Sequence, residues 1–388
     1  MKKGGCCLVS LIMILVLLGG TVAAGYFGGN YLMQKYIGDE GEWMQLGINN
    51  WGDLIDFLSG VKNIFTEEPE IDDADIPSEQ NLNLVKSELE SSIMGYDPET
   101  QLFDIENIVF KRPLRLTGGQ LAALIQEELS SQEESNELEF RIAQVKLEVE
   151  PDGESYCVIT FTMVIDKEVV EEPIKENLGF FGDMLLSGMS DIYITSVNKY
   201  IIDPDNPGKM IVDDSYGDND LFLGSGDSSA INEQIIGLMV SLFEASSKEE
   251  LNANFGSVVS EAVNNIGHVS FDYDQGVSYL VFDNPYNNDL IYQLIDIAEL
   301  DISQYEELEA EDVAALAQIK DDINQLLGVL ASTPLDEETT PNISDVQNAV
   351  NNVENEFNDF NDAYQSDPHA VDLTNLQNAV DALKALFD

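Results

Sequence analysis

Two neighbouring stretches decide the fold: ELEFRIAQVKLEVE (residues 137–150) and SYCVITFTMVIDKEV (residues 155–169). Apolar and polar residues alternate along both, which is typical of strands with one buried face. The turn sequence Pro-Asp-Gly (residues 151–153) separates them, so the pattern predicts a long antiparallel hairpin. The alternation slips by one residue before Val145, which predicts a β-bulge at that point.

Further strands and helices surround this hairpin and predict an α+β region over residues 81–285. Apolar residues at helical spacing predict a helix over 116–131, with Thr117 as its N-cap. A second hairpin is expected around the turn DPDNPG (residues 203–208), and a third around residues 274–276. The remaining expected elements are helices over 82–94, 231–245 and 249–266 and extended stretches over 102–110, 191–202, 209–213 and 267–285.

From residue 286 onward the chain has the periodicity of amphipathic helices. Four segments show it, near 287–300, 304–331, 343–364 and 371–387, with a loop over 332–341. Short connections between such helices favour an antiparallel bundle over residues 286–388. Two apolar stripes are expected to face each other within this bundle. They consist of Val346, Val350, Val353, Phe357, Phe360 and Tyr364, and of Leu373, Leu376, Val380, Leu383 and Phe387.

An uncharged apolar run near the N-terminus, residues 8–27, is long enough to cross a bilayer. Lys2 and Lys3 precede it and acids dominate after it, so the positive-inside rule places the N-terminus in the cytoplasm. Residues 1–27 are therefore expected to form a cytoplasmic tip and a single-pass membrane anchor. Representative apolar residues of this anchor are Leu8, Ile12, Leu15, Leu18 and Phe27. The rival interpretation is a cleaved signal peptide, and either one places the rest of the chain outside the cytoplasm.

Residues 28–80 form a juxtamembrane region. An amphipathic helix is expected over 42–65, followed by the acidic stretch TEEPEIDDADIPSEQ (residues 66–80). That stretch predicts an extended, self-repelling linker. At the other border of the anchor, Cys6 and Cys7 are candidates for acylation, since juxtamembrane cysteines are the usual sites.

The charge balance is extreme: 73 Asp and Glu face 17 Lys and Arg, for a net charge of −56. A body this negative repels nucleic acid and anionic lipid headgroups at long range. Diffuse cation binding and attraction of basic partners are compatible with it. Adaptation to a salty environment explains the same composition equally well.

Signatures of catalysis are missing from the sequence. Its two histidines, His268 and His369, lie in different segments without a cysteine cluster, which argues against a zinc or iron site. Nucleophile-elbow, phosphate-loop and metalloprotease motifs are absent. Cys157 lies alone in a predicted strand and is interpreted as a small buried hydrophobe. We therefore expect no enzyme activity and no cofactor.

Asp203, Asp205 and Asp214 are weak candidates for a metal site. The turn at residues 203–208 imitates the start of an EF-hand loop, with Asp214 at its twelfth position. Pro207 occupies the fifth ligand position without a side-chain oxygen, and the flanking segments are predicted strands. A solvated acidic turn is therefore the preferred interpretation, and no specific metal is expected.

Several segments follow one another in a distinctive layout. They are the N-terminal span, the helix LTGGQLAALIQ (116–126), the long hairpin, the strand IYITSVNKYII (192–202) and the helix INEQIIGLMVSLF (231–243). This layout resembles the YpmS-like family of uncharacterised, membrane-anchored proteins of Gram-positive bacteria. The resemblance implies an ectodomain similar to elongated lipid-carrying folds, in which a curved sheet wraps a helix. The acidic linker and the C-terminal bundle depart from that layout.

Two functions are expected from these features. The first is a membrane-anchored, extracytoplasmic interaction or structural protein without catalytic activity, whose C-terminal bundle contacts a protein partner. The alternative is a lipid- or amphiphile-binding ectodomain with an apolar groove between the 116–131 helix and the sheet. A continuous apolar tunnel would favour the second function, and a filled core would favour the first.

Overall fold

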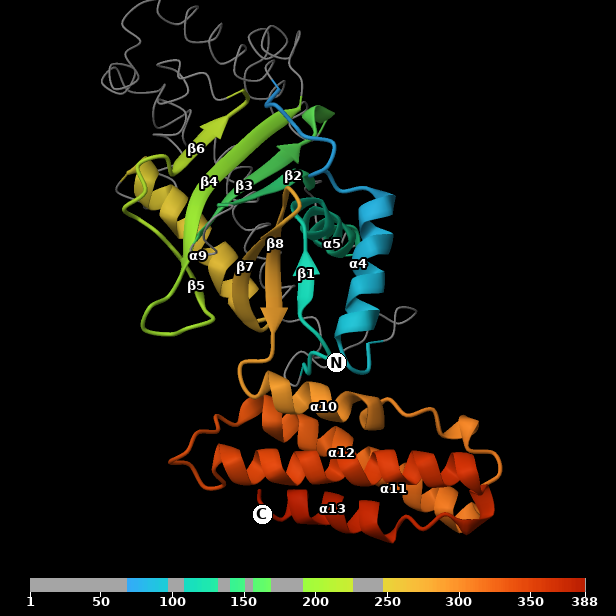
Figure 1. Cartoon of the computed structure of the whole chain (residues 1–388). Helices are drawn as coiled ribbons and strands as arrows, with labels where there is room; N and C mark the ends of the chain where they lie inside the picture. The colour runs from blue at the N-terminus through green and yellow to red at the C-terminus, as the bar shows by residue number, and fades with distance from the viewer. Residues whose placement is uncertain are drawn as a thin grey trace, which may run out of the picture. The chain divides into compact units, whose positions relative to one another are not determined.

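The computed structural model describes residues 68–96, 108–131, 140–150, 156–168, 191–225 and 247–387. Within these ranges the chain combines helices with antiparallel sheets, as the sequence pattern predicts (Figure 1). It divides into two compact units. The first draws on Met1–Glu88 and Arg115–Val281, and the second on Leu89–Leu114 and Phe282–Asp388.

A five-stranded antiparallel sheet organises the first unit, with the order β2-β3-β4-β5 and with β6 also paired to β4. Its strands are β2 (Phe140–Val149), β3 (Tyr156–Ile165), β4 (Ile192–Ile202), β5 (Met210–Val212) and β6 (Asp220–Leu223). The first two predicted hairpins are confirmed, because β2 pairs with β3 and β4 with β5. The register shifts between Ile142 and Gln144, which confirms the predicted bulge. Strand β6 was not predicted, because its four residues are too few to show a clear alternation.

Helix α9 (Lys248–Asn264) confirms the helix predicted near 249–266 and packs against β4, β5 and β6. Phe255 of this helix meets Phe161 of β3 with ring centroids 5.7 Å apart. Deeper in the same contact, the buried Asn252 side chain accepts a hydrogen bond from Ser196 Oγ at 2.8 Å. Buried polar groups are tolerated when they are hydrogen-bonded in this way.

Helix α5 (Gly118–Ser131) begins at the predicted cap. Thr117 Oγ1 accepts from the backbone N–H of Gln120 at 3.3 Å, and Gln120 Oε1 accepts from the N–H of Thr117 at 2.8 Å. This reciprocal pair is a capping box. The helix contacts β2 and turns an apolar face toward the interior of the unit. The buried apolar residues on this face include Leu121, Ile125 and Leu129.

The linker predicted over residues 66–80 is not a free spacer in the part that the structure describes. The N–H of Asp72 donates to Gln144 Oε1 at 3.3 Å, and the N–H of Val145 donates to the carbonyl of Asp75 at 3.1 Å. Both acceptor and donor on β2 lie at the bulge, where ladder pairing is interrupted. Hydrogen bonds to the backbone and to one side chain of β2 thus hold a segment that charge repulsion alone would extend.

Two glycines allow this segment to lie so close to α5. A Cβ atom at Gly118 would come within 1.9 Å of the Val145 carbonyl oxygen, and one at Gly119 within 2.2 Å of the Ala74 carbonyl oxygen. Only glycine accommodates backbone at this distance. Helix α4 (Glu79–Ser92) follows the docked segment and confirms the helix predicted near 82–94.

A second sheet has the order β1-β8-β7. Its strands are β1 (Leu114–Leu116), β7 (His268–Asp274) and β8 (Val277–Asp283). Gln275 and Gly276 connect β7 to β8 with φ angles of 51° and 92°. Positive φ at both central residues is the signature of a type I′ turn, and it confirms the third predicted hairpin.

Four helices of the second unit pack around one hydrophobic core. They are α10 (Asn288–Ala298), α11 (Ala310–Ser332), α12 (Ile343–Ser366) and α13 (Thr374–Lys384). Helices α12 and α13 contact each other, and both predicted apolar stripes point into the core. Tyr364 and Phe387, at the ends of the stripes, are only partly buried.

Helix α11 begins at Ala310 rather than near residue 304 as the periodicity predicts. Instead, the side chain of Asp301 accepts from the N–H of Ser303 and caps a separate turn, η4 (Ile302–Gln304). A second short turn, η5 (Pro368–Ala370), precedes α13. Local capping by aspartate competes with helix continuation in this way.

The second unit includes a segment from far upstream, Leu89–Leu114, whereas the sequence pattern starts the bundle at residue 286. Asn284 is fully buried and binds the backbone of Phe110 twice, accepting from its N–H and donating to its carbonyl, each at 2.9 Å. Val109 lies in the same hydrophobic core as the four helices. Such pairing across the sequence leaves no periodic signal.

Several predicted segments lie outside the described residues: the anchor at 8–27, Cys6, Cys7, the amphipathic helix at 42–65 and the helix at 231–245. Within the ranges that are described, no helix is both long and apolar enough to cross a bilayer.

Candidate functional site

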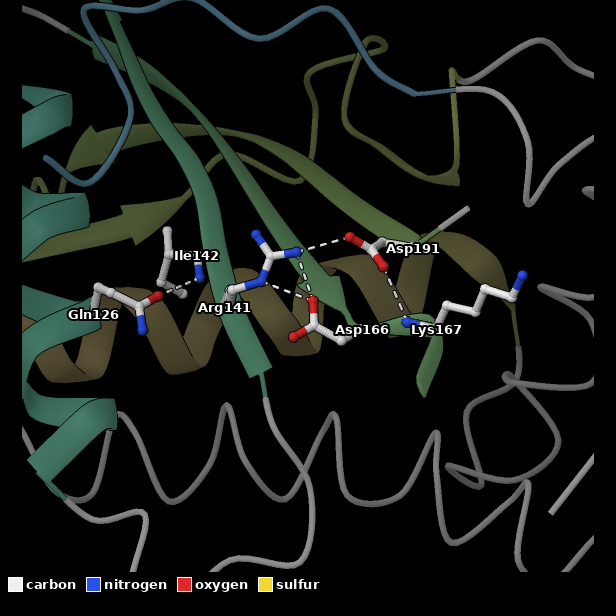
Figure 2. Close-up of polar contacts among 6 residues, drawn as sticks. All are labelled: Gln126, Arg141, Ile142, Asp166, Lys167 and Asp191. Atoms are coloured by element: carbon white, nitrogen blue, oxygen red, sulfur yellow. Dashed lines mark hydrogen bonds and ion pairs between the residues drawn. The ribbon is translucent and has the colours of Figure 1, made fainter. Parts of the chain in front are cut away.

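Arg141 joins the ends of three strands in the first unit (Figure 2). Its guanidinium donates to Asp166 Oδ1 through Nε at 2.8 Å and through Nη2 at 2.5 Å, and Nη2 also reaches Asp191 Oδ2 at 2.8 Å. Asp191 in turn accepts from the backbone N–H of Lys167 at 3.0 Å. The hydrogen bond to Asp166 is the main cause that raises the pKa of Arg141.

This cluster is best explained as a structural clamp. The Arg141 side chain is 48% exposed, and exposed ion pairs contribute about 0–1 kcal/mol. Both carboxylates already bind the guanidinium. Next to the cluster, Gln126 of α5 accepts from the N–H of Ile142 at 2.7 Å and ties the helix to the same strand end (Figure 2).

The three aspartates singled out by the sequence lie in surface turns around β5. Asp203 Oδ1 accepts from the N–H of Asp205 at 2.9 Å, and its Oδ2 accepts from Asn206 Nδ2 at 2.7 Å. These hydrogen bonds, that from Asn206 first, lower the pKa of Asp203. Asp214 is exposed. Among the described residues, no group of three or more His, Cys, Asp or Glu side chains is arranged to hold a metal ion.

Cys157 is fully buried in β3, as the sequence pattern predicts. Burial raises the pKa of its thiol to about 12. A thiol in this environment stays protonated at physiological pH and is a poor nucleophile. It therefore acts as a core side chain.

A hollow of about 800 Å³ lies along α11 in the second unit, and we call it the α11 groove. Helix α11 lines it with residues that include Lys320, Asn324, Gly328 and Val329. The end of α10 and the segments around Met94 and Val109 provide the other walls. The groove is thus built from both chain segments of this unit.

Asn324 lines the groove, and one atom of its side chain has no hydrogen-bond partner among the described residues. Its Oδ1 is buried and accepts no hydrogen bond within the described part of the chain. A buried acceptor without a donor costs about 1–3 kcal/mol. The four-residue spacing along α11 puts Lys320, Asn324 and Gly328 on one ridge of the helix.

Packing among the described residues does not explain why position 328 is a glycine. A Cβ atom at this position would meet no other atom within 4 Å. Glycine in a helix interior costs about 1 kcal/mol relative to alanine, and this one lies inside α11. The missing side chain leaves the helix backbone open to the groove.

Cations at the groove are already engaged. Lys111 Nζ contacts Glu299 Oε1 at 2.5 Å, and Lys320 Nζ donates to the Leu300 carbonyl at 2.7 Å. Asp296 and Asp321, on α10 and α11, are exposed. The charged side chains that line the groove are Glu299 and Lys320, whereas the bundle as a whole carries many more acids than bases.

Comparison of the chain with protein-family models, curated proteins and solved structures finds no match.

The α11 groove escapes sequence reasoning for a physical reason. Met94 and Val109 reach it from a segment that shows no helical period and lies far from α11 in the sequence. One signal was present: a glycine inside a long amphipathic helix without a nearby turn. Such a glycine destabilises the helix relative to alanine, so it is a candidate for a position with a function other than packing.

Proposed function

We propose that the chain is a membrane-anchored, extracytoplasmic interaction protein without catalytic activity, and that its helical bundle provides the contact surface. The α11 groove is the observation that carries this proposal. It is open, it combines apolar walls with a few polar groups, and it lies on a unit with its own hydrophobic core. Pockets of this composition bind ligands and partners.

The polar groups of the groove are suited to binding. Glu299 is paired with Lys111, and Lys320 is held by the Leu300 carbonyl. Both side chains are thus already bonded within the unit. The arrangement supports recognition in preference to proton transfer.

The membrane location rests on the sequence. Residues 8–27 and the lysines before them support a single-pass anchor with the body outside the cytoplasm. Membership of the YpmS-like family is part of the same proposal, and the arrangement of α5, β2, β3 and β4 is compatible with it. The alternative lipid-binding function needs a groove between α5 and the sheet, where Leu121, Ile125 and Leu129 are buried.

Site-specific photo-crosslinking in intact cells tests the proposal. A photoreactive residue would replace Val329 in the groove, Asn378 on α13, or Asp214 in the first unit, all of which are exposed. We expect a discrete protein adduct from one or both bundle positions and none from Asp214. The absence of protein adducts from both bundle positions, or a lipid that copurifies with the full-length chain in native mass spectrometry, would overturn the proposal.

A further inference from the structure

We infer that the α11 groove binds a basic amphipathic helix of a partner protein. This inference rests on the proposed function and adds the chemistry of the partner. It draws on two independent features: the shape of the groove at Gly328 and the net charge of the bundle.

The shape favours a helix as occupant. Lys320, Asn324 and Gly328 form a ridge along α11, and the ridge is interrupted at Gly328, where a Cβ atom would meet only open space. Helices pack by inserting the ridge of one into the groove of another, and a small residue lets the two axes approach. A helix of the partner can therefore place a side chain over Gly328.

The apolar residues that line the groove favour a partner helix with one apolar face. Met94 and Val109 contribute apolar walls, and Val329 adds a side chain that is 37% exposed. Amphipathic helices that dock into grooves bury apolar side chains at such positions.

Charge selects a basic helix. Residues 286–388 contain two lysines, Lys320 and Lys384, and no arginine, among many acids. Lys384 Nζ contacts Asp322 Oδ1 at 2.8 Å, and Lys320 is bonded to the Leu300 carbonyl. Acids therefore dominate the net charge of the bundle, and exposed ones such as Asp296 and Asp321 lie on its helices α10 and α11. Opposite charge on the partner speeds encounter and disfavours acidic competitors.

The test uses the full-length chain in nanodiscs of neutral lipid, with empty nanodiscs as the blank. The probe is a fluorescent synthetic helix with one leucine face and one lysine face, titrated at physiological salt. Matched peptides carry glutamate in place of lysine, or serine in place of leucine. We expect saturable binding of the Leu/Lys helix only.

Gly328→Leu is the decisive variant. Leucine is a better helix former than glycine, and the space around Gly328 is open, so the variant should melt at the same temperature as the parent or higher. The added side chain fills the groove, and we expect affinity for the Leu/Lys helix to fall about tenfold or more. Gly217→Leu is the matched control, because a Cβ atom there also meets no atom within 4 Å.

The inference is overturned if no peptide binds, if Gly328→Leu binds as well as Gly217→Leu, or if the glutamate peptide binds equally. A partner crosslinked from Asn378 and not from Val329 would preserve the proposed function and overturn this inference alone.

Discussion

At the scale of single residues, protonation of Asp75 makes the folding stability of the protein depend on pH. The pKa of Asp75 is raised from 3.8 to about 6. Burial is the main cause, the carboxylates of Asp72 and Glu148 contribute in the same direction, and Lys146 acts in the opposite direction. The folded protein thus holds this proton up to about pH 6, whereas the unfolded chain releases it near pH 3.8. The resulting stabilisation is fully present below pH 3.8 and is lost as the pH rises through 6.

Asp75→Asn removes this dependence at nearly constant side-chain size. At pH 7 we expect the variant to exceed the parent in free energy of unfolding by about 1 kcal/mol, a figure reduced for the half-exposed position of the carboxyl group. The difference should shrink toward pH 4, where Asp75 is protonated in the folded parent. Urea unfolding at pH 4, 5, 6 and 7 measures it.

The control for this series is Asp73→Asn, which removes the same charge from an exposed position of the same segment. It should follow the parent at every pH. A constant offset between Asp75→Asn and the parent from pH 4 to pH 7 would contradict the assigned protonation.

At the scale of elements, local pattern predicts most of the structure because its signals are local. Alternating apolar and polar residues form the paired strands β2 and β3, and a capping box begins helix α5. A turn with positive φ at Gln275 and Gly276 connects β7 to β8. The stripes of α12 and α13 are also correct, since one face of each helix packs on the common core. In each case neighbouring residues supply the whole signal.

Elements held by distant partners escape this reasoning. The acidic segment at 70–75 is shaped by Gln144 and Val145, and the segment around Val109 and Phe110 by Asn284 and the bundle core. Their own sequences predict a spacer and an extended stretch. The candidate site could not be predicted for the same reason, because Met94 and Val109 line the α11 groove together with residues of α11 that are distant in the sequence.

Val353→Asp tests the core of the bundle. Val353 is fully buried on α12, so the variant places an unpaired charge among apolar side chains. We expect the free energy of unfolding of the second unit to fall by about 3 kcal/mol or more. Circular dichroism during thermal unfolding measures the change. Asn352→Asp adds the same charge at an exposed position of the same helix and should leave the melting temperature nearly unchanged.

At the scale of the whole molecule, topology is the first question. If residues 8–27 span the membrane with Lys2 and Lys3 inside, then the second unit faces the exterior. Protease added to intact, wall-stripped cells should digest the bundle, and an epitope at the N-terminus should survive on a short fragment. Full protection of the chain until the membrane is permeabilised would contradict this topology.

The net charge of −56 gives the second whole-molecule prediction. Calcium should raise the melting temperature weakly by relieving repulsion, and magnesium or monovalent salt should reproduce the effect. The double variant Asp203→Asn with Asp205→Asn should respond like the parent, because Asp203 already binds Asp205 and Asn206 within its turn. Saturable, calcium-selective stabilisation that is lost in the double variant would instead reveal a specific site.

The hydrogen bonds between Phe110 and Asn284 have a consequence for the folding of the chain during its synthesis. The two residues are separated by 174 positions, so Phe110 leaves the ribosome long before its partner exists. Until then the backbone around Val109 has neither its hydrogen bonds nor its core. Closing so long a loop is slow, and unpaired apolar segments are prone to association. A nascent chain of this protein therefore has a long interval in which a chaperone or the membrane surface must shield residues 108–116.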